Sequence, residues 1–423
     1  MKRIIVIGGG FAGVNLIQHL KACDDVTVTL VDRNNYNFFP PLLYQVATGY
    51  LEASSISFPF RKLFRHRPEV RFHMGELLRV EPENHRVILS TGEMFYDLLI
   101  FATGAETNYF GNENVRHQAL PMKTIEDAIN LRNHFLLSLE KASRTENAAE
   151  REKLRTVVIA GAGPTGVEVS GMLAEIRKNI LPKDYPELAK AGGNSHIYLV
   201  DGGAKVLGPM SATAQDYTYE TLLDMGVEIK LNKHVKDFTD GKVIFNDGEE
   251  IVTGTLVWAA GVAASIFQGI PETSIGRGRR MLVDQFNRVA GLNDIFAIGD
   301  TALMPDAPGY PNGHPQLAQV AIQQGKNLAL NLLKLSKGKN MAAFNYIDRG
   351  TMAVIGRNKA VADLPHPRLN LKGILAWLMW VIVHLVSLLD FRNKIKTLWN
   401  WTGAYLTRDQ YLRFIIRPDK TND

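Results

Sequence analysis

The sequence predicts an α/β fold with two copies of one strand–helix–strand unit, followed by a helical C-terminal region. An apolar strand runs into a glycine turn at residues 3–13, and the same pattern returns at residues 155–166. A third observation is an uncharged, apolar stretch at residues 373–389. With 423 residues, 46% hydrophobic and 22% charged, the chain has the composition and length of a globular protein with two or three domains.

The first unit begins with RIIVIGGGFAG, and VTVTLVDR follows as its second strand. Gly8, Gly10 and Gly13 form the pattern G-x-G-x-x-G, and Asp32 ends the second strand. Such glycines permit a tight turn, close approach of a pyrophosphate and close helix–strand packing, while the acid accepts hydrogen bonds from a ribose. Because all the parts come in order, the unit is predicted to be a Rossmann-like dinucleotide-binding domain.

The second unit repeats this pattern with Gly161, Gly163 and Gly166, and Asp201 follows the strand HIYLV. The spacing from Gly161 to Asp201 is 40 residues, longer than usual, and the extension RKNILPKDYPELAKAGGNS explains the excess. An acid at this position repels the 2′-phosphate of NADP and favours NAD. A solvated acid at a strand end is the alternative interpretation of Asp201.

Further strands repeat across the chain. LLIFATGAET at residues 98–107 resembles TLVWAAGV at residues 255–262, and NDIFAIGDTA contains another strand that ends at Gly299 and Asp300. A helix is expected to follow from about Gln316. The predicted organisation is a first nucleotide domain in two parts (1–125 and 286–340), a helical crossing (126–154), a second nucleotide domain (155–285) and a C-terminal region (341–423).

Cysteine and histidine usage narrows the chemistry. Cys23 is the only cysteine, so an internal disulfide and a cysteine-ligated iron–sulfur cluster are excluded, and a reducing compartment is favoured. The histidines show no metal-ligand spacing, so no metal site is expected. The first strand starts almost at Met1, which predicts that no signal peptide precedes the fold.

Together, the two nucleotide units, the ATG strand at residues 102–104 and the Gly299-Asp300 strand end resemble the flavoproteins with two dinucleotide-binding domains. Their disulfide-reductase and sulfide:quinone-reductase branches use cysteines that this chain lacks. FFPPLLYQVATG, AQVAIQQG, DRGTMAVIGRNKAVADL and DFRNKIKTLWNWTGAYLTRDQ instead resemble the type II NADH:quinone oxidoreductases. An Asp at 201, where that family commonly has Glu, is the main departure.

This resemblance implies FAD as cofactor, NADH as co-substrate, and two-electron transfer to a membrane quinone (ubiquinone or menaquinone) without proton pumping. The residues implied for FAD are Gly8, Gly10, Gly13, Asp32, Ala102, Thr103, Gly104 and Asp300. Those implied for NADH are Gly161, Gly163, Gly166, Glu168 and Asp201. Those implied for the quinone are Tyr44, Gln45, Thr48, Gln319 and Gln323, and those implied for catalysis are Glu168, Gln319 and Gln323.

For several of these residues a structural interpretation stays open. Asp300 can cap a helix, and Glu168 can simply complement a helix dipole. The pair Gln319 and Gln323 can be a solvated helix face. The segment containing Tyr44, Gln45 and Thr48 can be ordinary core. Two rival functions also remain at this stage, a soluble NADH diaphorase or oxidase and an NADH-binding redox sensor.

The C-terminal region carries the net charge of the chain, +5, because residues 366–423 hold nine basic and four acidic side chains. The apolar stretch at 373–389 lies at the lower limit for a membrane span. Trp, Tyr, Lys and Arg at helical spacing after it predict monotopic attachment to an anionic lipid surface, on the cytoplasmic face of the inner (plasma) membrane. A true span or a buried core or dimer helix is the alternative, and a homodimer stays open. Nucleic acid is not an expected partner.

Overall fold

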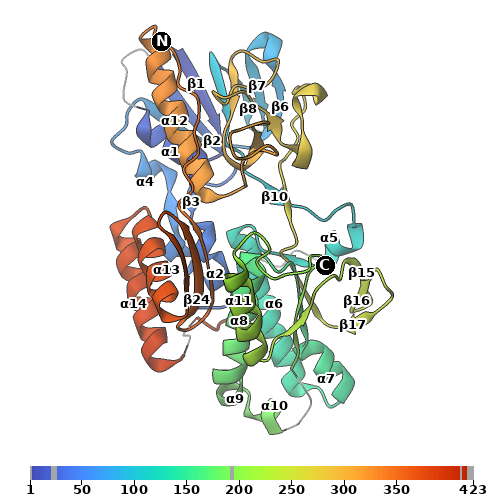
Figure 1. The fold of residues 1–423 in the computed structure, drawn as a ribbon. Helices are drawn as coiled ribbons and strands as arrows, with labels where there is room; N and C mark the ends of the chain where they lie inside the picture. The colour runs from blue at the N-terminus through green and yellow to red at the C-terminus, as the bar shows by residue number, and fades with distance from the viewer. Residues whose placement is uncertain (1, 21–25, 191–194, 410–411, 417–423) are drawn as a thin grey trace. The chain divides into compact units, whose positions relative to one another are not determined.

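The computed structural model describes residues 2–20, 26–190, 195–409 and 412–416, and the chain divides into two compact units. Each unit contains one of the two glycine turns (Figure 1). Cys23 lies outside the described residues. Unit 1 consists of Met1–Phe38, Ser57–Glu106 and Val262–Asp348, and unit 2 of Phe39–Ile56, Thr107–Gly261 and Arg349–Asp423.

Unit 1 is built on a sheet with strand order β21-β9-β1-β2-β5, in which every neighbouring pair is parallel. Helices α1 and α12 pack against each other beside this sheet (Figure 1). The elements of unit 1 are β1 (Lys2–Ile7), α1 (Phe11–His19), β2 (Val26–Asp32), β3 (Tyr36–Phe38), β4 (Ser57–Pro59), α4 (Phe60–Leu63), β5 (Val70–Met74), β6 (Leu77–Glu81), β7 (Arg86–Leu89), β8 (Gly92–Phe95), β9 (Leu98–Phe101), β19 (Val262–Ala263), β20 (Met281–Leu282), β21 (Ile295–Ala297), β22 (Ala302–Leu303) and α12 (Ala318–Ser336). Strand β10 (Glu106–Thr107) lies where the two units join in the chain.

The register of this sheet brings three strand ends together. Phe101, the last residue of β9, pairs with Ile7 of β1 on one side and with Ala297 of β21 on the other. The segments that follow these strands therefore leave the sheet at the same edge. In parallel α/β sheets, this edge is where ligands bind.

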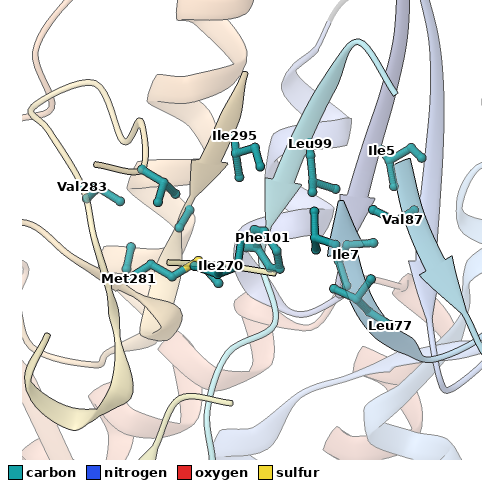
Figure 2. Packing of buried hydrophobic residues seen from close by; sticks show 14 of the residues in the cluster. Ile5, Ile7, Leu77, Val87, Leu99, Phe101, Ile270, Met281, Val283 and Ile295 are labelled. Carbon is teal, nitrogen blue, oxygen red and sulfur yellow. The ribbon is translucent and has the colours of Figure 1, made fainter. Parts of the chain in front are cut away.

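A hydrophobic core covers one face of the same sheet. Side chains of β1 and β9 face residues of β6, β7 and the 270–283 segment (Figure 2). Burial of such aliphatic side chains contributes about 25 cal/mol per Å² of apolar surface, so this layer stabilises the sheet that carries the glycine turn. Residues labelled in the figure are Ile5, Ile7, Leu77, Val87, Leu99, Phe101, Ile270, Met281, Val283 and Ile295.

Unit 2 has a second parallel sheet, with strand order β11-β18-β12-β13-β14, and an antiparallel meander β15-β16-β17. Its elements before the C-terminal region are α2 (Leu43–Ala47), α3 (Ala53–Ile56), α5 (Glu113–Gln118), β11 (Leu120–Pro121), α6 (Ile125–Arg144), α7 (Ala148–Arg155), β12 (Val157–Ala160), α8 (Pro164–Asn179), α9 (Leu181–Asp184), α10 (Pro186–Lys190), β13 (Ile197–Val200), α11 (Ala212–Asp224), β14 (Glu228–Lys230), β15 (Val235–Thr239), β16 (Lys242–Phe245), β17 (Glu250–Val252) and β18 (Thr255–Trp258). The predicted α/β fold with two Rossmann-like parts is confirmed.

The C-terminal region of unit 2 is an antiparallel sheet followed by two helices. The sheet has the order β23 (Thr351–Gly356), β24 (Lys359–Pro365) and β25 (Arg368–Lys372). The helices are α13 (Ile374–Ser387) and α14 (Phe391–Thr407), which contact each other, and α13 also packs on this sheet (Figure 1). Within the residues described, no helix combines the length and the apolar character that crossing a membrane requires.

Candidate functional site

The glycine turn of unit 1 has the geometry that its sequence predicts. Gly8 has a φ of +101°, and a Cβ there would lie 2.3 Å from the Ala102 carbonyl oxygen. A Cβ on Gly13 would lie 2.0 Å from the Gly8 carbonyl oxygen. Around Gly10, in contrast, an added Cβ meets no atom within 4 Å. Two glycines therefore permit the turn to form, and the third leaves its outer surface open to a ligand.

Asp32 is attached to this turn by backbone hydrogen bonds. The Gly9 amide donates to one carboxylate oxygen at 2.7 Å, and the Asn34 amide donates to the other at 2.8 Å. Burial raises the pKa of Asp32 by more than these two hydrogen bonds lower it, so the pKa lies above its ordinary value. Each oxygen keeps acceptor capacity for a ribose hydroxyl.

The neighbouring strand ends supply hydroxyl groups to the same edge of the sheet. Ala102 continues the β9 strand by donating its amide to the Ile7 carbonyl at 2.8 Å, and Gly104 has a φ of +68°. The hydroxyls of Thr103 and Thr301 are buried, and neither has a hydrogen-bond partner within the described chain. A buried hydroxyl without a hydrogen-bond partner destabilises the folded protein, so such groups usually bond to a bound molecule or to water.

Two glutamines that the sequence did not single out fix the turn around Asp300. The Gln324 side-chain oxygen accepts a hydrogen bond from the Gly299 amide at 2.7 Å. The Gln316 side-chain amide donates to the Asp300 carbonyl at 3.1 Å. Gln324 is buried on α12, one position after a residue predicted to bind quinone. A single sequence gave no signal for its role, because its partner lies 25 residues away along the chain.

The predicted quinone residues of α12 contact the segment that ends unit 1. Gln319 donates from its side-chain amide to an Asp348 carboxylate oxygen at 3.5 Å. Gln323 makes two bonds with the Ile347 backbone, donating to its carbonyl at 2.8 Å and accepting from its amide at 3.0 Å. The Gln323 side chain thus uses both its amide and its oxygen on the backbone of one residue. The quinone role of both residues stays a prediction.

The glycine turn of unit 2 repeats that of unit 1. Gly161 has a φ of +109°, and a Cβ on Gly166 would lie 1.8 Å from the Gly161 carbonyl oxygen. Gly163, like Gly10, has no atom within 4 Å of an added Cβ. The carboxylate of Asp201 accepts from the Ala162 and Gly203 amides, each at 2.6 Å. This turn therefore has the same open face and the same strand-end acid.

Glu168 points away from the second turn. Its carboxyl is buried on α8 and accepts a 3.5 Å hydrogen bond from the Val354 amide of β23. Helix and strand are close here, because a Cβ on Gly171 would lie only 1.7 Å from the Ile355 carbonyl oxygen. Burial raises the pKa of Glu168 well above its ordinary value. The role of Glu168 toward NADH or catalysis stays a prediction.

Tyr44, Gln45 and Thr48 lie together on and just after α2, and all three are buried. The Thr48 hydroxyl donates to the Tyr44 carbonyl at 2.8 Å. Gln45 donates from its amide to the Tyr44 hydroxyl at 3.1 Å and accepts at 2.6 Å from the Trp401 indole N–H of α14. Trp401 is a residue of this cluster that the sequence did not assign, since 356 positions separate it from Gln45.

Over the described ranges, no group of three or more His, Cys, Asp or Glu side chains is placed to hold a metal ion.

Comparisons with known proteins match this arrangement over nearly the whole chain. The family description "Pyridine nucleotide-disulphide oxidoreductase" matches residues 2–325, and "NDH2 C-terminal domain" matches residues 349–409. The type II NADH:quinone oxidoreductase NdhA of Mycobacterium tuberculosis is 36% identical, covering 96% of this chain and 87% of that protein. The corresponding protein Ndh of the same organism is 34% identical, covering 96% and 88%.

A solved structure supports the same fold. NDH2 from Plasmodium falciparum in complex with NADH superposes with a TM-score of 0.88 at 24% identity, covering 98% of this chain and 100% of that one. The chain therefore belongs to the pyridine nucleotide-disulphide oxidoreductases. Within that class it belongs to the type II NADH:quinone oxidoreductase family, which confirms the resemblance seen in its motifs.

Proposed function

We propose that this chain is an FAD-dependent enzyme that transfers two electrons from NADH to a membrane quinone without pumping protons. The observation that carries the proposal is the presence of two dinucleotide turns with matching strand-end acids in a chain that is related over 96% of its length to an enzyme of this activity. When bound, FAD supplies the two-electron chemistry between the nicotinamide and the quinone. The protein supplies binding, orientation and electrostatics.

The first turn fits FAD. The open face at Gly10 leaves room for a pyrophosphate at the start of α1, where backbone amides and the helix dipole favour negative charge. Asp32 accepts ribose hydroxyls, and the unpartnered hydroxyls of Thr103 and Thr301 gain hydrogen bonds from the cofactor. Asp300 comes shortly after β21, which ends at the same edge of the sheet, and it completes the set of residues proposed for FAD.

The second turn fits NADH by the same reasoning. Gly163 opens the face of the turn, and Asp201 holds two acceptor oxygens beside it. A fixed carboxylate at this point repels a 2′-phosphate and selects NADH over NADPH. A disulfide relay needs two cysteines and this chain has one, so bound FAD would supply its electrons to the quinone without a cysteine pair between them. The residues proposed for the quinone remain Tyr44, Gln45, Thr48, Gln319 and Gln323.

The decisive experiment separates the two half-reactions. Anaerobic rapid mixing with NADH should bleach the flavin, and a short-chain ubiquinone or menaquinone added next should restore its colour. Gln319→Leu removes a neutral hydrogen bond worth about 0.5–1.5 kcal/mol, so reoxidation by quinone should slow about 2- to 13-fold. Reduction by NADH should keep its wild-type rate.

Asn327→Leu provides a matched control, because it removes an amide from the same helix at a position with no proposed ligand. It should leave both half-reactions unchanged. If Gln319→Leu slowed both half-reactions equally, α12 would help to position the flavin and would not contact the quinone. Failure of wild-type flavin to reoxidise with any quinone would overturn the proposed function itself.

We also propose that α13 and α14 attach the protein to an anionic lipid surface, on the cytoplasmic face of the plasma membrane. Both helices carry apolar side chains that are exposed. On α14 the exposed fractions are 74% for Phe391, 78% for Trp399 and 74% for Leu406. Arg392, Lys394 and Lys396 lie on the same helix as these residues. A soluble diaphorase would not need such a surface, and a single cysteine fits a reducing compartment. The exposed apolar residues on α13, α14 and the segment between them are Ile374, Leu375, Leu378, Ile382, Val383, Val386, Leu389, Phe391, Ile395, Leu398, Trp399 and Leu406.

Vesicle flotation tests this attachment. The protein should float with vesicles that contain phosphatidylglycerol, and less with neutral phosphatidylcholine vesicles, since each basic residue near an anionic surface contributes about 1 kcal/mol. High salt should weaken the binding without abolishing it, because burial of the apolar residues does not depend on salt. Complete release by salt, or no flotation at all, would count against the lipid surface.

A further inference from the structure

The chain of hydrogen bonds from Trp401 through Gln45 to Tyr44 has a defined direction. An indole N–H can only donate, so the Gln45 side-chain oxygen must face Trp401, where the contact is 2.6 Å. The Gln45 amide nitrogen then faces the Tyr44 hydroxyl at 3.1 Å. The indole therefore determines which end of the glutamine amide faces Tyr44, and the amide must donate to the tyrosine oxygen.

Packing holds this chain in one arrangement. Tyr44 is 2% exposed and Gln45 is 5% exposed, so neither side chain exchanges freely with water. The Trp401 ring lies 5.4 Å from the Trp380 ring, which in turn stacks on His384 at 4.1 Å. These aromatic contacts hold the indole in place while its N–H is hydrogen-bonded to Gln45.

The direction of the chain determines what Tyr44 can do. Its oxygen already accepts a hydrogen bond from Gln45, and within the described chain the hydroxyl has no other hydrogen-bond partner. Its proton is therefore available for an acceptor that is not part of the protein. Burial, together with the nearby Glu168, raises the pKa of Tyr44 well above its ordinary value, so the hydroxyl keeps this proton at neutral pH.

We propose that Trp401 is a positioning residue for the quinone, because through Gln45 it directs the Tyr44 hydroxyl proton toward a quinone carbonyl oxygen. This inference rests on the function proposed above. A quinone carbonyl is an acceptor without a proton of its own, so it requires a donor on the protein. Tyr44 makes the contact with the ligand, and Gln45 and Trp401 act through it.

The sharpest test reverses the direction of the chain. Gln45→Glu keeps nearly the same shape and keeps an acceptor for Trp401, but an ionised carboxylate cannot donate to the tyrosine oxygen and instead accepts a hydrogen bond from the Tyr44 hydroxyl. At alkaline pH, reoxidation by a short-chain quinone should therefore be about 2- to 13-fold slower than in the wild type. As the pH falls, the new carboxyl takes up a proton, its O–H donates to Tyr44, and the difference from the wild type should shrink.

Two further variants keep the test decisive if Gln45→Glu does not fold with its flavin. Tyr44→Phe removes the donor, and its rate of reoxidation should show a comparable loss that does not vary with pH. Trp401→Phe frees the glutamine amide to rotate, and its loss should be smaller. Trp377→Phe makes the same indole-to-phenyl change on α13, where the ring stacks on Tyr405, and should keep the wild-type rate.

Reduction of the flavin by NADH should be unchanged in all four variants. Two results would overturn the inference. One is a wild-type rate of reoxidation in Gln45→Glu across the whole pH range, and the other is a rate in Trp401→Phe that equals the rate in Trp377→Phe. A merely structural role for Trp401 predicts slowing without any pH dependence in Gln45→Glu. All of these rates are compared with a wild-type enzyme that reduces quinone. Failure of the proposed function would instead appear in the wild type itself, as flavin that no quinone reoxidises.

Discussion

The glycine turns of units 1 and 2 have nearly the same backbone. Gly8 and Gly161 have φ angles of +101° and +109°, and each donates its amide to the last or penultimate residue of the second strand at 2.8 Å. In each unit, an amide of the turn also donates to the strand-end acid, at 2.7 Å for Asp32 and 2.6 Å for Asp201. The turn is thus determined locally, by glycines whose missing side chains make the close approach possible.

The helices after the two turns differ in what surrounds them. Asn15 and Glu168 hold the same position relative to the glycines, but Asn15 is half-buried and donates to the Phe11 carbonyl of its own helix at 2.8 Å. Glu168 is buried against β23. The short glycine motif therefore defines how a nucleotide turn folds, while neighbouring elements determine which contacts the following helix makes.

The first prediction addresses the part that both turns share and should have the largest effect. Gly166→Ala places a methyl group 1.8 Å from a backbone oxygen, so the turn must shift. We expect a loss of about 1–3 kcal/mol in stability, together with the loss of NADH binding. Thermal unfolding and NADH titration measure the two effects.

Gly163→Ala is the control, because its new methyl group meets no protein atom within 4 Å. This variant should lose less stability than Gly166→Ala. Its affinity for NADH should nevertheless be lower than in the wild type, since the methyl group occupies space proposed for the pyrophosphate. Both variants should keep their FAD, which is assigned to the other unit. FAD loss from Gly166→Ala at temperatures where it remains folded would show that the two units are not independent.

The second prediction asks whether the matching acids serve different nucleotides. Asp201→Ala removes an acceptor for the ribose, and the loss of one charge-assisted hydrogen bond worth about 1.5–3 kcal/mol should lower the affinity for NADH roughly 10- to 150-fold. Affinity for NADPH should fall less, because the repulsion of its 2′-phosphate is removed as well. The ratio of kcat/KM for the two cofactors measures this difference.

Asp32→Ala is the mirror variant in unit 1. It should lower FAD retention without changing the preference between NADH and NADPH. If wild-type kcat/KM is the same for both nicotinamides, or if Asp32→Ala shifts the preference as much as Asp201→Ala, the assignment of one nucleotide to each unit is wrong.

Much of the fold was predictable because its signals are local. The glycine spacing, the strand-end acids and the repeated strands near Ala102 and Ala259 are short patterns, and each forms the same structure in both units. The family resemblance was carried by such stretches as well. The longer spacing before Asp201 also had a local cause, since helices α9 and α10 occupy part of the extension.

The rest of the site depends on contacts between distant residues. Gln324, Gln316 and Trp401 gain their roles from partners 25, 16 and 356 positions away. The direction of the Glu168 side chain likewise depends on β23, which follows it by 186 residues. No helical or strand period in one sequence reports such neighbours, so these side chains appeared as ordinary helix positions.

The third prediction uses the position at which the units differ, and its effect over one pH unit should be the smallest. Because burial raises the pKa of Glu168, the folded protein keeps a proton there at pH values where the unfolded chain has lost it. Stability should therefore fall as the pH rises from the ordinary value of 4.5 toward the raised one, by up to about 1.4 kcal/mol per pH unit. Denaturant unfolding at a series of pH values measures this slope.

Glu168→Gln cannot ionise, so it should flatten the slope while filling the same space. Asn15→Gln changes the matching position of unit 1 without adding or removing a titratable group, and it should leave the wild-type slope intact. An unchanged slope in Glu168→Gln would mean that the carboxyl already reaches water in the folded protein. The second position after the third glycine would then be equivalent in the two units, and the contact with β23 would not isolate Glu168 from solvent.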